Sequence, residues 1–110
     1  MEIQWFERKF SFSYKENIFP SIIERLDGTA IRLNHKINQI QEEIWTIQPD
    51  GRWSIQENVG HLIDLEPLWY GRLDDILEEK KYMRSADLEN RKTHLANHNG
   101  EKMSVLLEKF

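Results

Sequence analysis

Apolar residues recur every three or four positions through the first half of the chain. The spacing corresponds to one apolar seam along a helix, and it is sustained over about four heptads, which predicts a long helix packed in a bundle or coiled coil. Helix-breaking residues at 27–29 predict a kink or break, and the turn signal at 49–51 predicts that the helix ends near Trp45. The seam consists of Phe19, Ile23, Leu26, Ala30, Leu33, Ile37, Ile40, Ile44 and Ile47.

A second helix is predicted to start at Ser54, because Ser54 and Glu57 have the spacing of a capping box. Its apolar face continues to about residue 79, with a bend expected at Pro67. Residues 80–90 read as a solvated connection, residues 97–100 as a breaker, and residues 103–110 as a short final helix. No strand pattern competes. The prediction is a single all-α domain over residues 1–110, an up-and-down helical bundle.

The composition limits the kinds of functional site that the chain can form. The chain has 110 residues, a net charge of −4 and no cysteine, so disulfides, thiolate metal sites and a cysteine nucleophile are excluded, and metal ligands must come from His, Asp and Glu. The acidic balance disfavours nucleic acid as a partner, and no apolar run is long enough for a membrane span or a signal peptide. A cytoplasmic protein is expected. Nucleotide-binding loops and the serine-hydrolase elbow are absent from the sequence.

The second helix carries the strongest candidate site. At 100° per residue, Glu66 falls within the apolar arc and His61 at its edge, and such groups build metal sites in bundle cores. The structural alternative is that Glu66 pairs with Arg25, Arg32 or another basic side chain and that His61 is a hydrogen-bonded boundary residue. A catalytic metal needs about three protein ligands, so one histidine is not a site.

The remaining histidines are weaker candidates. His94 and His98 are four residues apart and could chelate a metal on a helix, but their Asn- and Gly-rich surroundings favour a loop whose polar residues pack back onto the bundle. His35 points away from the seam and is expected to be solvated.

The stretch from Trp53 to Glu66 resembles the DinB-like (DinB/YfiT) superfamily, whose second helix opens with a WSxxE start and carries an HLxDxE stretch. Residues 5–10, 19–20, 24–26, 71–75 and 87–99 agree with other blocks of that family. The resemblance implies a four-helix bundle, often dimeric, in which three histidines hold a divalent metal such as nickel or zinc. Family members of known chemistry transfer groups to low-molecular-weight thiols, and others are called metal-dependent hydrolases.

Carried over residue by residue, His61 matches the first metal ligand. The other two belong to an HxxxH motif on a final helix, and the chain ends at Phe110 before it, so the bundle is expected to be C-terminally truncated and its metal site incomplete. The ligand role is not transferred to His94 or His98. Glu66 and Asp64 are the candidate catalytic residues, as base or orienting group.

Two functions follow as expectations. The first is a metal-dependent thiol transferase or hydrolase with a small thiol or other small molecule as substrate. The second is a non-catalytic bundle that acts through self-association or partner binding. A homodimer or higher homo-oligomer is expected in either case, because the apolar seam and four Trp residues exceed what one short chain can cover.

Overall fold

The structure is a computed structural model that describes residues 4, 7–9, 11 and 16–110. Its described residues form helices, short 3-10 turns and connections, with no strand among them, which confirms the all-α prediction. Part of the N-terminal block at 5–10 lies outside the described residues. None of the described helices is both long and apolar enough to cross a membrane.

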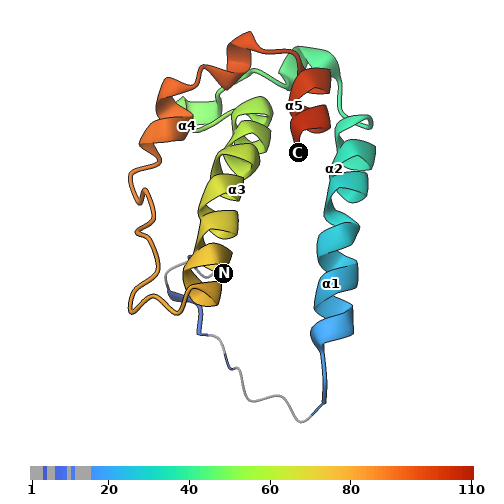
Figure 1. The fold of residues 1–110 in the computed structure, drawn as a ribbon. Helices are drawn as coiled ribbons and strands as arrows, with labels where there is room; N and C mark the ends of the chain where they lie inside the picture. Colours follow the sequence, from blue (N-terminus) through green and yellow to red (C-terminus); the bar gives the residue numbers. More distant parts are fainter. Residues whose placement is uncertain (1–3, 5–6, 10, 12–15) are drawn as a thin grey trace.

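The first long helix is interrupted at Gly28, which separates α1 (Phe19–Asp27) from α2 (Thr29–Ile37). The interruption is slight, since the Gly28 N–H donates to Glu24 O and Gly28 O accepts from Arg32 N–H, both at 3.0 Å. Gly28 itself has α-helical backbone angles. The two helices therefore follow one another almost end to end (Figure 1). The interruption lies within residues 27–29, where the sequence predicts a kink or break.

The predicted end of this helix near Trp45 is wrong. The helix ends at Ile37, with Asn38 as its C-cap, and the chain then turns into η2 (Glu42–Ile44) and η3 (Pro49–Gly51). Asn is a poor helix former that favours turns, and Asn38 bonds Asn34 side chain to side chain at 2.7 Å. The apolar spacing continues past Asn38 in the sequence although the helix does not.

The second long helix, α3 (Ile55–Leu77), starts with the predicted capping box and runs through Pro67. Ser54 Oγ accepts the Glu57 N–H at 3.0 Å, and the Glu57 carboxylate accepts the Ser54 N–H at 2.8 Å. A connection follows, as predicted, and leads to α4 (Arg91–Leu95), η4 (His98–Gly100) and the short α5 (Met103–Lys109).

The core is small and lies at one end of the molecule, where α2, α3 and α5 converge (Figure 1). Away from this end, α1 and the second half of α3 diverge. The radius of gyration is 16.5 Å, whereas a compact 110-residue domain has about 13 Å. The buried core residues are Ile37, Val59, Met103 and Leu106, with Leu33, Trp45, Ile55, Ile63 and Leu107 packed against them.

The tryptophans are distributed unevenly around this core. Trp45 packs against it, Trp53 is half-buried at the start of α3, and Trp69 is exposed. Trp69 is thus outside the core of this single chain, because no described element covers its part of α3.

Candidate functional site

Polar side chains at the start of α3 hold the η4 segment against the helix. Ser54 Oγ donates to Asn99 Oδ1 at 2.6 Å, in addition to capping α3. Gln56 Nε2 donates to the backbone oxygens of His98 and Glu101 at 2.7 and 2.5 Å. Ser54 and Gln56 are both buried, so these bonds satisfy groups that would otherwise lose their hydration without compensation.

One turn further along α3, Gly60 makes room for the imidazole of His98. A Cβ at this position would overlap the His98 ring, which explains why a residue with low helix propensity stands inside a helix. Another turn on, Asp64 Oδ2 lies 2.7 Å from His98 Nε2, and both side chains are only 10% exposed. Gln56, Gly60 and Asp64, spaced four apart, thus form one stripe that seats His98.

His61 joins the same network through Thr93 of α4. The Thr93 hydroxyl donates to Asp64 Oδ2 at 2.8 Å, and Thr93 Oγ1 lies 2.9 Å from His61 Nδ1. A carboxylate only accepts hydrogen bonds, so the single Thr93 proton is used on Asp64 and Thr93 Oγ1 must accept from His61. The network therefore favours a proton on His61 Nδ1 and leaves Nε2 with a free lone pair.

The surroundings of His61 favour its neutral form. Burial lowers the pKa of His61, the Asp64 carboxylate partly opposes this effect, and the nearby His98 lowers the pKa further. The Trp53 ring packs beside the imidazole, with centroids 4.8 Å apart, and also lies 5.3 Å from the His94 ring. A neutral imidazole with an available nitrogen can bind a metal or accept a proton.

Two cavities adjoin these residues. A cavity of about 180 Å³ is lined by His61, Asp64 and Thr93, together with Ser85 and Lys92. It is smaller than the pockets that take drug-sized ligands, so it suits a molecule of few heavy atoms.

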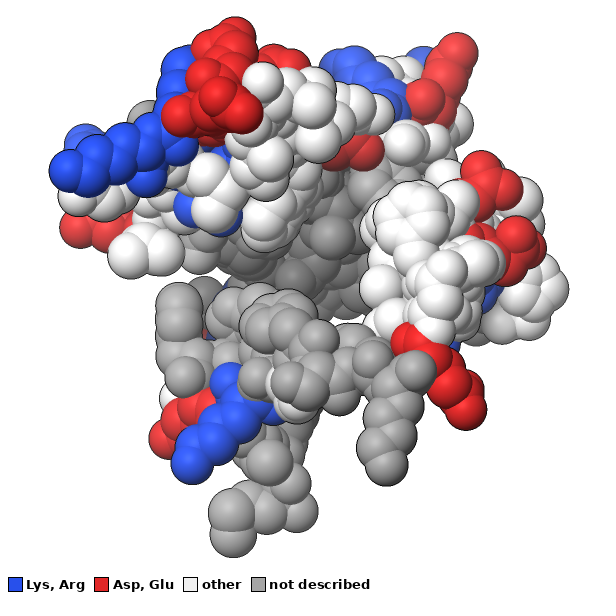
Figure 2. All heavy atoms as spheres, turned by 60° about the horizontal axis from the view of Figure 1, so that its bottom comes forward, with Lys and Arg blue, Asp and Glu red and all other residues white. Residues whose placement is uncertain are grey.

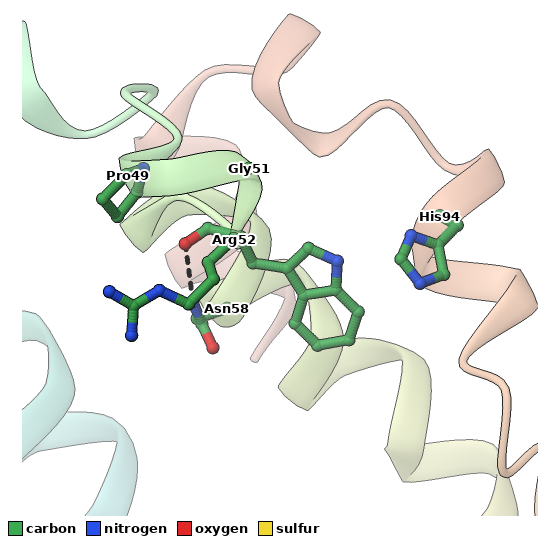
Figure 3. A pocket seen from close by; sticks show the side chains of 6 residues that line it. Pro49, Gly51, Arg52, Asn58 and His94 are labelled. Atoms are coloured by element: carbon green, nitrogen blue, oxygen red, sulfur yellow. Dashed lines mark hydrogen bonds between the residues drawn. The ribbon is translucent and has the colours of Figure 1, made fainter.

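The second cavity, of about 650 Å³, lies between η3 and α4 beside Trp53, with His94 facing the turn that carries Gly51 (Figure 3). Asn58 Nδ2 fixes the start of α3 here by donating to the Trp53 carbonyl at 3.5 Å.

The structure brings two of the three predicted site residues together. His61 and Asp64 share the network through Thr93, whereas Glu66 lines a different, apolar cavity between α3 and the first helices. Glu66 has no hydrogen bond or ion pair with any described residue, so the predicted pairing with Arg25 or Arg32 is not formed. The catalytic role of Glu66 stays a prediction.

The other histidines divide between surface and interior. His35 is exposed and contacts Gln39 at 3.1 Å, which confirms its predicted surface position. His94 and His98 do not share a helix, because Asn97 between them has a left-handed backbone (φ 51°) that ends α4. The segment packs back onto α3 through hydrogen bonds. This is the loop arrangement that the sequence analysis gives as the alternative to a helical pair of metal-binding histidines.

The fit to a metal is partial. His61 Nε2 is a suitable ligand atom held by a hydroxyl and a carboxylate, the arrangement that orients metal-binding histidines. Within the described part of the chain, however, no group of three or more His, Asp or Glu residues is arranged to hold an ion. The described residues therefore do not complete a catalytic metal site, and one ligand is all that they offer with this geometry.

Thr93 and His98 belong to the network around His61, but their places in it do not follow from spacing on one helix. Both lie about 30 residues from their partners on α3, in a stretch without periodicity. The signal that points to them is Gly60, since a glycine inside a strongly capped helix indicates that another group approaches the backbone closely.

Comparison with known proteins identifies the family of the chain. Residues 25–109 match the family model of the DinB superfamily. Neither the curated proteins nor the solved structures contain a match to the chain. The matched range covers most of the chain, including all of α3, α4 and α5 and the network around His61. The chain belongs to the DinB superfamily.

Proposed function

We propose that this protein is a metal-dependent enzyme, of the thiol transferase or hydrolase type, in which His61 Nε2 ligates a divalent metal such as nickel or zinc. One observation carries the proposal: the His61–Thr93–Asp64 network uses the Nδ1 proton and leaves Nε2 free beside a small cavity. Asp64 acts through Thr93 and is a positioning residue in this proposal.

The chain's own residues prepare the site in two ways. Burial and the Trp53 ring keep water from one side of His61, and the lowered pKa of His61 keeps its lone pair available at neutral pH. A bound metal would lower the pKa of a thiol or water, so the protein needs no cysteine of its own. The remaining ligands would come from outside the described residues.

The proposed substrate is a small thiol or another small molecule, because the cavity beside His61 is small and has Lys92 and Ser85 among its lining residues. A free thiol substrate persists in the cytoplasm, where cellular reductants keep thiols reduced. We therefore place the reaction in that compartment.

The test compares metal content and metal affinity in His61→Ala and His35→Ala. His35 is the matched control, since it is an exposed histidine far from the network. Protein purified without an affinity tag is analysed for nickel and zinc and then titrated with each by calorimetry. We expect His61→Ala to lose stoichiometric binding and His35→Ala to keep it. Equal metal in wild type and His61→Ala, or none in wild type after titration, would overturn the proposal.

A further experiment separates the two reaction types. Co²⁺-substituted protein is mixed with 2-mercaptoethanol, and the absorption spectrum is searched for a thiolate-to-metal charge-transfer band. A band that is present in His35→Ala and absent in His61→Ala supports a thiol transferase. A spectrum unchanged by the thiol favours the hydrolase type.

A further inference from the structure

Twice on α3 a glycine is followed four residues later by an aspartate, and each pair receives a side chain from the chain that returns along the helix. The first pair begins at Gly60 and seats His98. The second pair is Gly71 and Asp75, and it seats Arg84, whose guanidinium a Cβ at Gly71 would overlap. The two glycines are 11 residues apart, about three helical turns, so both pairs lie on the same side of α3.

The second pair holds Arg84 by its backbone and by its side chain. The Arg84 N–H donates to Asp75 Oδ2 at 2.7 Å, and Arg84 Nε and Nη2 donate to Asp75 Oδ2 and Oδ1, each at 3.0 Å. Arg72 Nε donates to Arg84 O at 3.1 Å. The Asp75 side chain is only 3% exposed, and a guanidinium that binds both oxygens of a carboxylate forms strong hydrogen bonds. We call Gly71, Arg72, Asp75 and Arg84 the Arg84 clamp.

The chain beyond the Arg84 clamp has much less support. Residues 85–90, which we call the strap, lead toward α4 alongside α3 (Figure 1). Within the described part of the chain no hydrogen bond joins the strap to α3; Asn90 N–H and Lys92 N–H instead donate to the backbone oxygen and the carboxylate of Asp87, both at 3.1 Å. Leu88 is 74% exposed. A segment with so few buried contacts opens locally at a low cost in free energy.

The strap forms part of the wall of the cavity beside His61. After the strap, the bond from the Thr93 hydroxyl to Asp64 fastens the chain to α3 again. An outward movement of the strap between these two fastened points would remove one wall of the cavity. The strap residues that line it are Ser85, Ala86, Asp87 and Asn90.

The charges of the Arg84 clamp do not extend into a surface for a charged partner. Figure 2 views the molecule from the side where α3 ends, and the acidic and basic side chains of the described residues lie there in mixed groups, with no continuous surface of either sign. The Asp75 carboxylate is satisfied within the chain, since it also accepts a bond from Lys80 Nζ at 3.1 Å. The clamp therefore acts on the chain itself.

We propose that the strap is a gate to the cavity beside His61 and that the Arg84 clamp holds the gate closed. Arg84 and Asp75 are positioning residues in this gate, because neither lines the cavity and both act through the strap. The closed cavity admits molecules of few heavy atoms, and opening of the strap admits larger ones and lets a product leave. The gate controls access to an imidazole, so it goes beyond the proposed function and does not depend on a metal.

The reaction of each histidine with diethyl pyrocarbonate, followed by mass spectrometry, tests the gate. The reagent modifies a neutral imidazole nitrogen that it can reach. We expect Arg84→Ala to raise the rate at His61 at least tenfold over wild type, because a hydrogen bond to a charged group favours the closed strap by about that factor or more. The rate at the exposed His35 should not change. His98 should stay slow, because the other glycine–aspartate pair still holds it.

Gly71→Ala releases the Arg84 clamp without removing any of its bonding groups, because the added Cβ displaces the Arg84 guanidinium. Alanine favours a helix more than glycine does, so a faster reaction at His61 in this variant does not come from a weakened α3. Gly28→Ala is the matched control, since Gly28 also has helical backbone angles and lies outside the clamp. We expect the control to react like wild type.

A nitroxide label attached at Leu88→Cys reports the motion of the strap directly, because the natural chain has no cysteine. Its electron paramagnetic resonance lines should sharpen when Arg84→Ala is added. Equal rates at His61 in wild type, Arg84→Ala and Gly71→Ala would overturn the proposal, and so would identical spectra of the label with and without Arg84→Ala. A rise at His98 in parallel with His61 would also overturn it, because the whole fold would then open and not the strap alone.

Discussion

The Thr93 hydroxyl links the histidine of the site to its carboxylate. Thr93→Val keeps the shape of the side chain and removes the hydroxyl, so it leaves Asp64 without that donor and His61 Nδ1 without its acceptor. We expect metal affinity, measured by calorimetric titration with Zn²⁺ or Ni²⁺, to fall about 10–100-fold. Thr93→Ser keeps the hydroxyl and should bind within a few-fold of wild type. Equal affinities in the Val and Ser variants would show that the link does not orient His61.

At this scale the sequence predicts only the part of the site that lies on one helix. His61 and Asp64 are three residues apart, so helical geometry alone places them near each other. Thr93 and His98 reach them only after the chain has crossed a long connection, and no local pattern determines where such a segment returns. Gly60 is informative because its missing side chain reflects the approach of His98.

The start of α3 is a junction at the scale of elements. Ser54 caps the helix and also bonds Asn99 of η4, and it is fully buried. Ser54→Ala loses the cap, worth about 1 kcal/mol, and the bond to Asn99, worth a further 1 kcal/mol or so. We expect the free energy of unfolding in urea to drop by about 2 kcal/mol. Ser21→Ala, at an exposed position of α1, should change it little; an equal loss in both variants would contradict this account.

The connection after α3 is tied down by Asp75. Its carboxylate accepts bonds from Arg84 N–H and Nε at 2.7 and 3.0 Å and from Lys80 Nζ at 3.1 Å. The side-chain and backbone bonds from Arg84, with a further bond from Lys80, hold the pKa of Asp75 far below its usual range. The folded pKa is thus below the unfolded value of about 3.9, so the stabilisation is complete at neutral pH and is lost as the pH falls below about 4.

Asp75→Asn should therefore lower the urea midpoint at neutral pH and flatten its dependence on pH below about 4. Asp74→Asn is the control, because Asp74 is the exposed neighbour on the same helix. Parallel pH profiles for wild type and Asp75→Asn would show that the Asp75 carboxylate is not the group responsible.

The sequence predicts a helix end well where a local capping motif marks it. It predicts the end poorly where the apolar spacing and the turn preference of a residue oppose each other. The start of α3 is encoded in Ser54 and Glu57, which bond each other's backbone directly. The end of α2 at Ile37 was missed because the apolar spacing continues past Asn38. There the turn preference of Asn38 prevails. The Gln56 N–H donates to Trp45 O at 2.9 Å, and this bond ties the following loop to α3.

At the scale of the molecule, α1 adds no residue to the buried core and exposes apolar side chains. The buried core lies at the α2–α5 end and includes no residue of α1. If a second copy covers these side chains, as expected from the sequence, dilution should expose α1 before α3. We expect amide hydrogen exchange in α1 to accelerate on dilution below the dimer dissociation constant, while the first turns of α3 stay protected. Exchange in α1 independent of protein concentration would contradict the dimer.

The sequence predicts the all-α class of the fold. It does not predict which apolar faces the chain covers with its own residues. Helical periodicity and the residues from Trp53 to Glu66 indicated an all-α chain of the DinB superfamily, to which it belongs. Periodicity does not say whether an apolar face meets its own chain or another molecule. Trp69 illustrates this, since it lies on the apolar face of α3 and is nevertheless 55% exposed.

The most direct test of the central claim is the tautomer of His61 in solution, from the ¹⁵N chemical shifts of its two ring nitrogens at neutral pH. The account predicts a neutral ring with the proton on Nδ1 and a free Nε2, and a titration midpoint below about 6.5. His35 in the same spectra serves as the exposed reference. A proton on Nε2, or a ring already protonated at neutral pH, would contradict the account.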